Sequence, residues 1–148
     1  MIAFVQRVSS ARVEVDHQII GQIDKGLLVL LCAERDDNQS IANKMLDKIL
    51  KLRIFSDCQG KMNHSVQDVG GGLLIVSQFT LAADCSGGNR PSFVQAAPPE
   101  LGKSLYEYFL ASAKQRHLNV QSGQFGADMQ VHLVNDGPVS IPLRMSVI

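Results

Sequence analysis

Residues 27–32 read LLVLLC, an uninterrupted apolar run that follows a turn signal at Lys25 and Gly26. A strand with one solvated face alternates apolar and polar residues, whereas a strand buried on both faces is continuously apolar. The run therefore predicts a central strand that is covered on both sides of its sheet.

The segments around this strand predict two helices and seven or eight strands. One helix spans residues 38–52, because Ile41, Met45 and Ile49 recur every four residues after a possible cap at Asn38 or Ser40. A proline pair opens the second helix, which runs from residue 98 to about 117. Strands are expected at residues 2–8, 12–15, 19–23, 27–32, 73–79, 119–122, 129–134 and 139–147. Mostly hairpin connections favour one α+β domain over residues 1–148, with mostly antiparallel, barrel-like sheets.

The composition is that of an ordinary globular domain of 148 residues, with 45% apolar and 19% charged residues. Its three cysteines form an odd set without a Cys-x-x-Cys pair, which is typical of a reducing compartment. We find no signal peptide, and the longest apolar run is too short to span a bilayer. We therefore expect a cytoplasmic protein that needs no membrane.

The pattern of charged and metal-binding residues excludes several classes of site. The four histidines are scattered without ligand spacing, and Gly70 to Gly72 lack the Lys-Ser/Thr that follows a phosphate-binding loop. We therefore expect no metal and no organic cofactor. The formal net charge is zero, which argues against extended nucleic-acid binding but permits local contacts with a short piece of RNA.

Two polar segments remain as candidate sites. Residues 77–81 read SQFTL and directly follow the apolar residues 73–76. Their hydroxyls and amide suit a polar ligand at the mouth of a sheet. An equally good interpretation is a strand end at which the serine and threonine only form the hydrogen bonds of the following turn. Residues 135–139 read NDGPV, which favours a β-turn, but a Gly-Pro pair also permits close approach of a ligand.

These two segments resemble the signature motifs of the D-aminoacyl-tRNA deacylase family, also known as the D-tyrosyl-tRNA(Tyr) deacylase family, which usually read SQFTL and GPVT. The resemblance covers nearly the whole chain. Here Ser140 takes the place of the usual threonine and Gly87 that of a usual lysine, and the tail after Ser140 differs from the usual ending. Pro142 in that tail requires an edge position or a bulge in the last strand. Five further stretches support the resemblance: residues 6–8, 52–55, 60–63, 89–93 and 125–129.

The resemblance implies a homodimer that hydrolyses D-aminoacyl-tRNA, and glycyl-tRNA, at active sites on the subunit interface. A cis peptide bond at Gly137-Pro138 of one subunit would enter the pocket of the other, hold the substrate α-ammonium with its carbonyl groups and clash with an L side chain. Arg7 would brace this turn, and Phe125 and Met129 would line the amino-acid site. The catalytic residues would be Ser77, Gln78, Phe79 and Thr80.

Two mechanisms fit these motifs. Thr80 could be the nucleophile, but a hydroxyl nucleophile needs an activating base and none stands beside it in the sequence. We favour the alternative, in which the 2′-hydroxyl of the terminal ribose positions or activates water and the backbone N–H of Phe79 or Thr80 stabilises the oxyanion. Two rival functions are a non-catalytic RNA-binding module and an unrelated esterase that uses Thr80.

Overall fold

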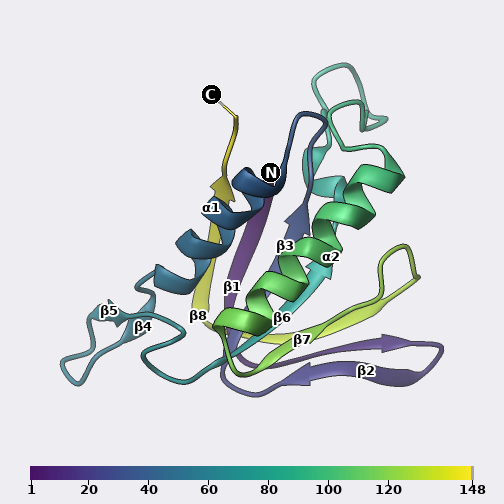
Figure 1. Cartoon of the computed structure of the whole chain (residues 1–148). Coiled ribbons are helices and arrows are strands. Elements are labelled where there is room, and N and C mark those ends of the chain that lie inside the picture. Colours follow the sequence, from purple (N-terminus) through teal and green to yellow (C-terminus); the bar gives the residue numbers. More distant parts are fainter. Residues whose placement is uncertain (148) are drawn as a thin grey trace.

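The fold is built on a six-stranded mixed sheet (Figure 1). Its strands lie in the order β2-β1-β3-β6-β7, and β8 also pairs with β1. The computed structural model describes residues 1–147, so Ile148, the last residue of the predicted domain, lies outside the described residues. The strands of this sheet are β1 (Ile2–Val15), β2 (Gln18–Ile23), β3 (Gly26–Cys32), β6 (Gly72–Ser77), β7 (Val120–Ser122) and β8 (Gln130–Arg144).

Three pairings of the sheet are antiparallel and two are parallel. β1 runs antiparallel to β2, β3 and β8, while β6 runs parallel to β3 and to β7. The parallel pairings arise because α1 (Gln39–Lys51) connects β3 to β6, and α2 (Pro99–Arg116) connects β6 to β7. The predicted α+β class with two helices and a barrel-like sheet is confirmed, although the two strand–helix–strand crossovers were not predicted.

The sheet curls until it is nearly closed. Its two ends, β2 and β7, approach each other at Gly21, where an added Cβ atom would lie 2.6 Å from the backbone oxygen of Ser122. Only a residue without a side chain permits this approach. The closure produces two apolar cores, one inside the curled sheet and one beneath the helices.

Strand β3 contributes alternate side chains to both cores, as the run at residues 27–32 predicts. Leu27, Val29 and Leu31 pack with the helices, and Leu28 packs inside the curled sheet. Figure 1 shows α1 and α2 side by side over one face of the sheet. Asn38 caps α1 by accepting a hydrogen bond of 3.0 Å from the backbone N–H of Ile41. Neither described helix is long and apolar enough to cross a membrane.

Several strand boundaries differ from the predicted ones. Residues 2–15 form one continuous strand, and the two predicted strands at 129–134 and 139–147 are a single strand that ends at Arg144. Among the described residues β8 pairs with β1 alone, so Pro142 occupies an edge strand, as expected. β6 ends at Ser77 instead of continuing to Phe79. A separate ribbon of β4 (Phe55–Ser56) and β5 (Met62–His64) was not predicted, because segments this short carry no measurable alternation.

Candidate active site

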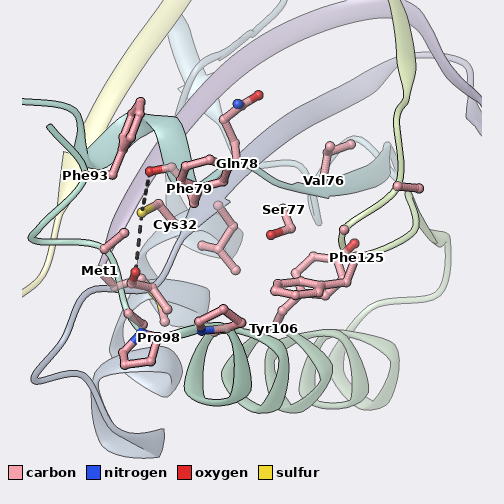
Figure 2. A pocket seen from close by; sticks show the side chains of 18 of the residues that line it. Met1, Cys32, Val76, Ser77, Gln78, Phe79, Phe93, Pro98, Tyr106 and Phe125 are labelled. Atoms are coloured by element: carbon pink, nitrogen blue, oxygen red, sulfur yellow. Dashed lines mark hydrogen bonds between the residues drawn. The ribbon is translucent and has the colours of Figure 1, made fainter. Parts of the chain in front are cut away.

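A cavity of about 740 Å³ lies between the end of β6, the start of α2 and the chain that leads into β8. Ser77, Gln78 and Phe79 line it from one side, and Phe125 and Met129 line it from the other. Figure 2 shows Ser77 and Phe125 facing the same space, with α2 beneath them. The structure therefore brings together five of the nine residues that the sequence predicted for the site.

The polar end of β6 turns into the short 3₁₀ helix η1 (Phe79–Ala82), which forms the rim of the cavity. The backbone N–H of Gln78 donates to the carbonyl of Leu31 at 2.8 Å, and this bond ties the turn to β3. The ring of Phe79 is 57% exposed and packs edge-to-face on Phe93, with ring centres 5.1 Å apart. The first N–H groups of a helix have no acceptor within it, so those of Phe79 and Thr80 can donate elsewhere.

Thr80 lies on the exposed surface of η1 and not in the lining of the cavity. Its hydroxyl oxygen accepts a hydrogen bond from the side-chain amide of Gln78. An amide nitrogen donates and cannot take up a proton, so this contact does not activate the hydroxyl as a nucleophile.

No carboxylate or imidazole group lines the cavity within the described chain. His117 contacts the carbonyl of Gly71 at 2.6 Å, and His132 contacts Glu14 at 2.5 Å. His64 stands in β5, and His17 occupies the turn between β1 and β2 with φ of 65°. The described chain thus supplies the cavity with polar groups but with no carboxylate or imidazole to act as a general base.

The apolar floor of the cavity contains a tyrosine that the sequence motifs did not indicate. Tyr106 on α2 stands next to Phe125, with ring centres 5.9 Å apart, and its hydroxyl donates to the carbonyl of Ile75 at 2.7 Å. Burial raises the pKa of Tyr106 to about 12, so the phenol stays neutral. Tyr106 is more deeply buried than Tyr108, the other tyrosine on α2.

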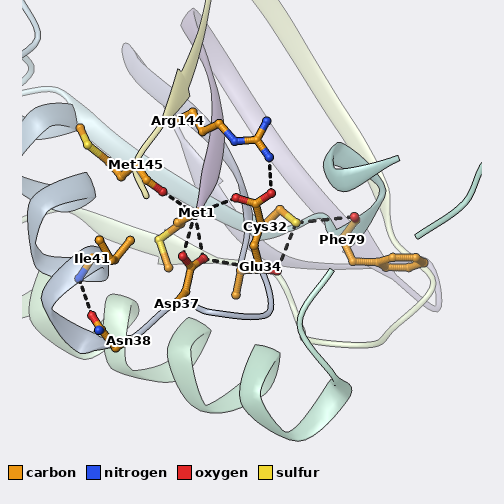
Figure 3. Close-up of polar contacts among 10 residues, drawn as sticks. Met1, Cys32, Glu34, Asp37, Asn38, Ile41, Phe79, Arg144 and Met145 are labelled. Atoms are coloured by element: carbon orange, nitrogen blue, oxygen red, sulfur yellow. Dashed lines mark hydrogen bonds and ion pairs between the residues drawn. The ribbon is translucent and has the colours of Figure 1, made fainter. Parts of the chain in front are cut away.

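Cys32 is a second lining residue that the sequence motifs did not assign to the site. Its thiol donates to the carbonyl of Phe79 across 3.6 Å, as Figure 3 shows. Burial, followed by the negative charge of Glu34, raises the pKa of Cys32 to about 11. A thiol that stays protonated at neutral pH is a poor nucleophile, so Cys32 supports η1 without being suited to attack an ester.

Arg35 is the one charged side chain that lines the cavity within the described chain. Its Nε donates to the carbonyl of Val94, which holds the guanidinium at the cavity edge. The preceding Glu34 is engaged elsewhere, because the backbone nitrogen of Met1 lies 3.1 Å from its carboxylate and 2.8 Å from that of Asp37 (Figure 3). Arg35 therefore gives the edge of the cavity a positive charge, which suits a phosphate-bearing ligand.

The other predicted residues, Arg7, Gly137 and Pro138, do not line this cavity. Arg7 donates to the carbonyl of Asp136, just before Gly137, at 2.9 Å and to that of Ile54 at 2.7 Å. The Gly137-Pro138 peptide bond is cis, and both residues are exposed on β8. Within the described chain, the two signature motifs are thus not parts of the same pocket.

No group of three or more His, Cys, Asp or Glu residues in the described chain could hold a metal ion. The independence from metals and cofactors stays a prediction, which activity in the presence of a chelator would test.

The fold and the cavity together define a small α+β protein with a ligand pocket where a strand of its mixed sheet ends. The chain belongs to the D-Tyr-tRNA(Tyr) deacylase family, whose model matches residues 4–144. It is 67% identical to the D-aminoacyl-tRNA deacylase of Variovorax paradoxus, over 99% of this chain and 100% of that protein. It is 66% identical to the enzyme of the same name from Aromatoleum aromaticum, over 98% and 95% of the two chains. The resemblance seen in the sequence is confirmed.

Two solved structures share the fold. One, described as "c-Myc DNA Unwinding Element Binding Protein", superposes with a TM-score of 0.93 and 42% identity, over 99% of this chain and 100% of the other. The second is described as a probable eukaryotic D-amino acid tRNA deacylase and has a TM-score of 0.80, with coverage of 96% and 97%. At 16% identity, this second structure supports the fold alone.

Proposed function

We propose that this chain is a D-aminoacyl-tRNA deacylase, which hydrolyses the ester between a D-amino acid, or glycine, and the 3′ end of tRNA. The observation that carries the proposal is that the polar residues Ser77 and Gln78 and the apolar residues Phe79, Phe125 and Met129 line one cavity in a member of this family. The reaction takes place in the cytoplasm, where charged tRNA is used for translation.

The cavity suits the parts of such a substrate. The apolar floor accepts the aminoacyl group, and the exposed ring of Phe79 offers a surface on which the terminal base can stack. The guanidinium of Arg35 faces the phosphate groups of the tRNA end. These roles need only local contacts, which agrees with a net charge of zero.

Water, and not Thr80, is the nucleophile in this proposal. The terminal 2′-hydroxyl positions a water molecule at the ester carbonyl, and the N–H groups of Phe79 and Thr80 stabilise the oxyanion that forms. Collapse of the tetrahedral intermediate breaks the bond to the ribose 3′-oxygen, which takes up the proton that the attacking water releases by way of the 2′-hydroxyl. The products are tRNA with a free 3′-hydroxyl group and the free amino acid. The absence of a base beside the Thr80 hydroxyl supports this assignment within the described chain.

A second copy of the chain completes each active site. Pro138 and Gly137 are exposed and lie outside the cavity of their own subunit. In a two-fold dimer, the turn of each subunit enters the cavity of its partner. The carbonyl groups of the turn then bind the α-ammonium, and an L side chain would be driven into backbone atoms. Glycine has no side chain to be rejected and is accepted.

The activity is tested by comparing D-tyrosyl-tRNA, L-tyrosyl-tRNA and glycyl-tRNA in single-turnover assays, with and without a chelator. We expect kcat/KM for the D-substrate to exceed that for the L-substrate by at least about a hundredfold. One extra methylene group in a hydrophobic pocket changes the transition-state free energy by about 1–3 kcal/mol, and a clash of a whole side chain with fixed backbone should cost more. Equal hydrolysis of both enantiomers would contradict the rejection mechanism, and no hydrolysis of any of the three would contradict the enzyme function.

The shared active site is tested by mixing two inactive variants. Gly102→Leu fills the cavity, because an added Cβ at this position of α2 points at the ring of Phe125 from 3.6 Å. Gly137→Ala damages the turn. In a random mixture, about half of the dimers are hybrids and each hybrid has one intact site, so about a quarter of wild-type activity should return. Both changes placed in one chain and mixed with wild-type subunits give hybrids without an intact site. Failure of the two single variants to restore activity in verified hybrids would contradict the shared site.

A nucleic-acid-binding module is the competing function, since one of the similar structures is described as a protein that binds a DNA unwinding element. Such a module grips several phosphates and is normally basic. This chain has 14 basic and 14 acidic residues, and one charged side chain at its cavity within the described residues. Tight, salt-dependent binding of DNA without hydrolysis of any aminoacyl-tRNA would favour the module.

A further inference from the structure

The turn at Gly137-Pro138 sits in a bulge of β8 that is held at both of its ends. β8 pairs with β1 at Asn135 opposite Val8 and again at Ser140 opposite Gln6. Between these pairs, Arg7 alone stands opposite the four residues 136–139. Four residues opposite one cannot continue the ladder, so the bulge needs other contacts to define its shape.

Asn135 provides two of these contacts from the base of the bulge. Its side-chain oxygen accepts a hydrogen bond from the backbone N–H of Val139 at 2.8 Å. Its side-chain nitrogen donates to the hydroxyl of Ser140 at 2.9 Å. One amide group thus spans the bulge and fixes the chain immediately after Pro138.

The remaining contacts hold the other parts of the bulge. Arg7 binds the carbonyl of Asp136, just before Gly137, at 2.9 Å. The side chain of Val139, just after Pro138, is buried in the core beneath the helices. Gly137 and Pro138 are therefore the exposed part of a segment whose two flanks are fixed.

We propose that Asn135, acting through Val139 and Ser140, is a positioning residue that sets how strictly the enzyme rejects L-aminoacyl-tRNA. This inference rests on the proposed function, in which the Gly137-Pro138 turn is the surface that an L side chain strikes. A clash discriminates only if the backbone cannot retreat from it. The hydrogen bonds of Asn135 prevent that retreat at the end of the turn that Arg7 does not reach.

The chemistry of the amide decides which substitutions remove its two contacts. Asparagine both accepts and donates, whereas aspartate only accepts and alanine does neither. Asn135→Asp keeps an acceptor for Val139 and loses the N–H that donates to Ser140, but the Ser140 hydroxyl can reverse its role and donate to the carboxylate. Ser140→Ala removes the same contact from the opposite side, and Ser140→Thr keeps the hydroxyl group. The shared hydroxyl explains why Ser140 can replace the usual threonine at this position.

The simpler alternative is that Asn135 only stabilises a turn, as asparagine commonly does. In that case its replacement would lower the melting temperature and the amount of folded protein, and the ratio of D- to L-substrate turnover would stay constant. A change in this ratio in folded, dimeric protein therefore separates positioning from stability.

The experiment measures kcat/KM for D- and L-tyrosyl-tRNA with four variants: Asn135→Ala, Asn135→Asp, Ser140→Ala and Ser140→Thr. The dimeric state and the melting temperature of each variant are verified first. We expect Asn135→Ala to lower the D/L ratio at least about tenfold, mainly by raising hydrolysis of the L-substrate, the change expected for loss of about one net hydrogen bond. Ser140→Ala should lower it less, while Asn135→Asp, which can accept from both Val139 and Ser140, and Ser140→Thr should stay close to wild type. The control is Asn43→Ala on α1, which removes a 3.0 Å contact with Tyr108 away from the turn.

An unchanged D/L ratio in folded Asn135→Ala would overturn the inference. If that variant does not fold, an unchanged ratio in Ser140→Ala has the same force. Wild-type protein that does not hydrolyse D-tyrosyl-tRNA would instead contradict the proposed function itself, so the two failures are distinguishable.

Discussion

A D-tyrosyl-tRNA whose terminal adenosine lacks the 2′-hydroxyl should be hydrolysed about 10²–10⁴-fold more slowly than the normal 3′-linked substrate, the range that positioned acid–base groups contribute to catalysis. The reason is that the cavity, within the described chain, contains no carboxylate or imidazole group that could position or activate the attacking water in place of the 2′-hydroxyl. The measurement is single-turnover deacylation with both substrates at saturating enzyme, so that a difference in binding does not obscure the chemical step.

The same comparison includes Thr80→Ala, which we expect to retain most of the wild-type rate. Thr80 lies outside the cavity lining, and its hydroxyl accepts a hydrogen bond from Gln78 without contacting a base. Alanine keeps the backbone N–H that is proposed to stabilise the oxyanion. Loss of an essential nucleophile costs several orders of magnitude in rate, so the two mechanisms predict clearly different results.

The contrary outcome is a Thr80→Ala protein that folds, binds substrate and is inactive, together with full reactivity of the 2′-deoxy substrate. That pair of results would assign the attack to Thr80. A trapped acyl-enzyme, with the amino acid esterified to the Thr80 hydroxyl, would support the same conclusion independently.

The elements of the fold with long periodic patterns were predictable from the sequence. Ile41, Met45 and Ile49 identify the buried face of α1, and the continuous run in β3 indicates burial on both sides. The parallel pairings were not predicted, although a helix between two strong strands is the known signal for a crossover. The long strands β1 and β8 were each divided in two, because Ser9 and Ser10 and the Gly-Pro pair look like turns in isolation.

The sequence named some of the residues that line the cavity and missed others. Ser77 to Phe79, Phe125 and Met129 meet at one cavity, and their roles in catalysis and substrate binding stay predictions. Tyr106, Cys32 and Arg35 were not anticipated, because each is an ordinary residue in its own segment and acquires a place in the site only through tertiary packing. Helical periodicity could have pointed to Tyr106, since it lies three residues before the buried Phe109 on the same face of α2.

The bulge at Gly137 explains why this part of the site could not be derived from spacing. Sequence pattern favours a simple β-turn at residues 135–139, whereas the structure has a continuous strand with four residues opposite Arg7. The side chains that define this bulge come from positions 7, 135 and 140, which only the pairing of β1 with β8 brings together.

Gly137→Ala should lower kcat/KM for D-tyrosyl-tRNA by about 10²-fold, the loss expected when a group that positions substrate moves by about 1 Å. Gly137 has a φ of 140°, which L side chains rarely adopt. An added Cβ would lie 2.8 Å from a side-chain carbon of Val139 and 3.1 Å from the guanidinium of Arg7. Because Val139 is buried and Arg7 is hydrogen-bonded, the exposed turn is the part that must move.

The matched control for this change is Gly60→Ala, in the turn that joins β4 and β5. Gly60 also has a positive φ, of 77°, but an added Cβ there meets no atom within 4 Å. Both variants introduce backbone strain of roughly 1–3 kcal/mol, so both should lower the melting temperature by a few degrees. Only Gly137→Ala should also lose activity, because only its turn enters the partner's cavity in the proposed dimer. Equal, near-wild-type turnover by the two variants would show that the turn at Gly137 takes no part in binding the substrate.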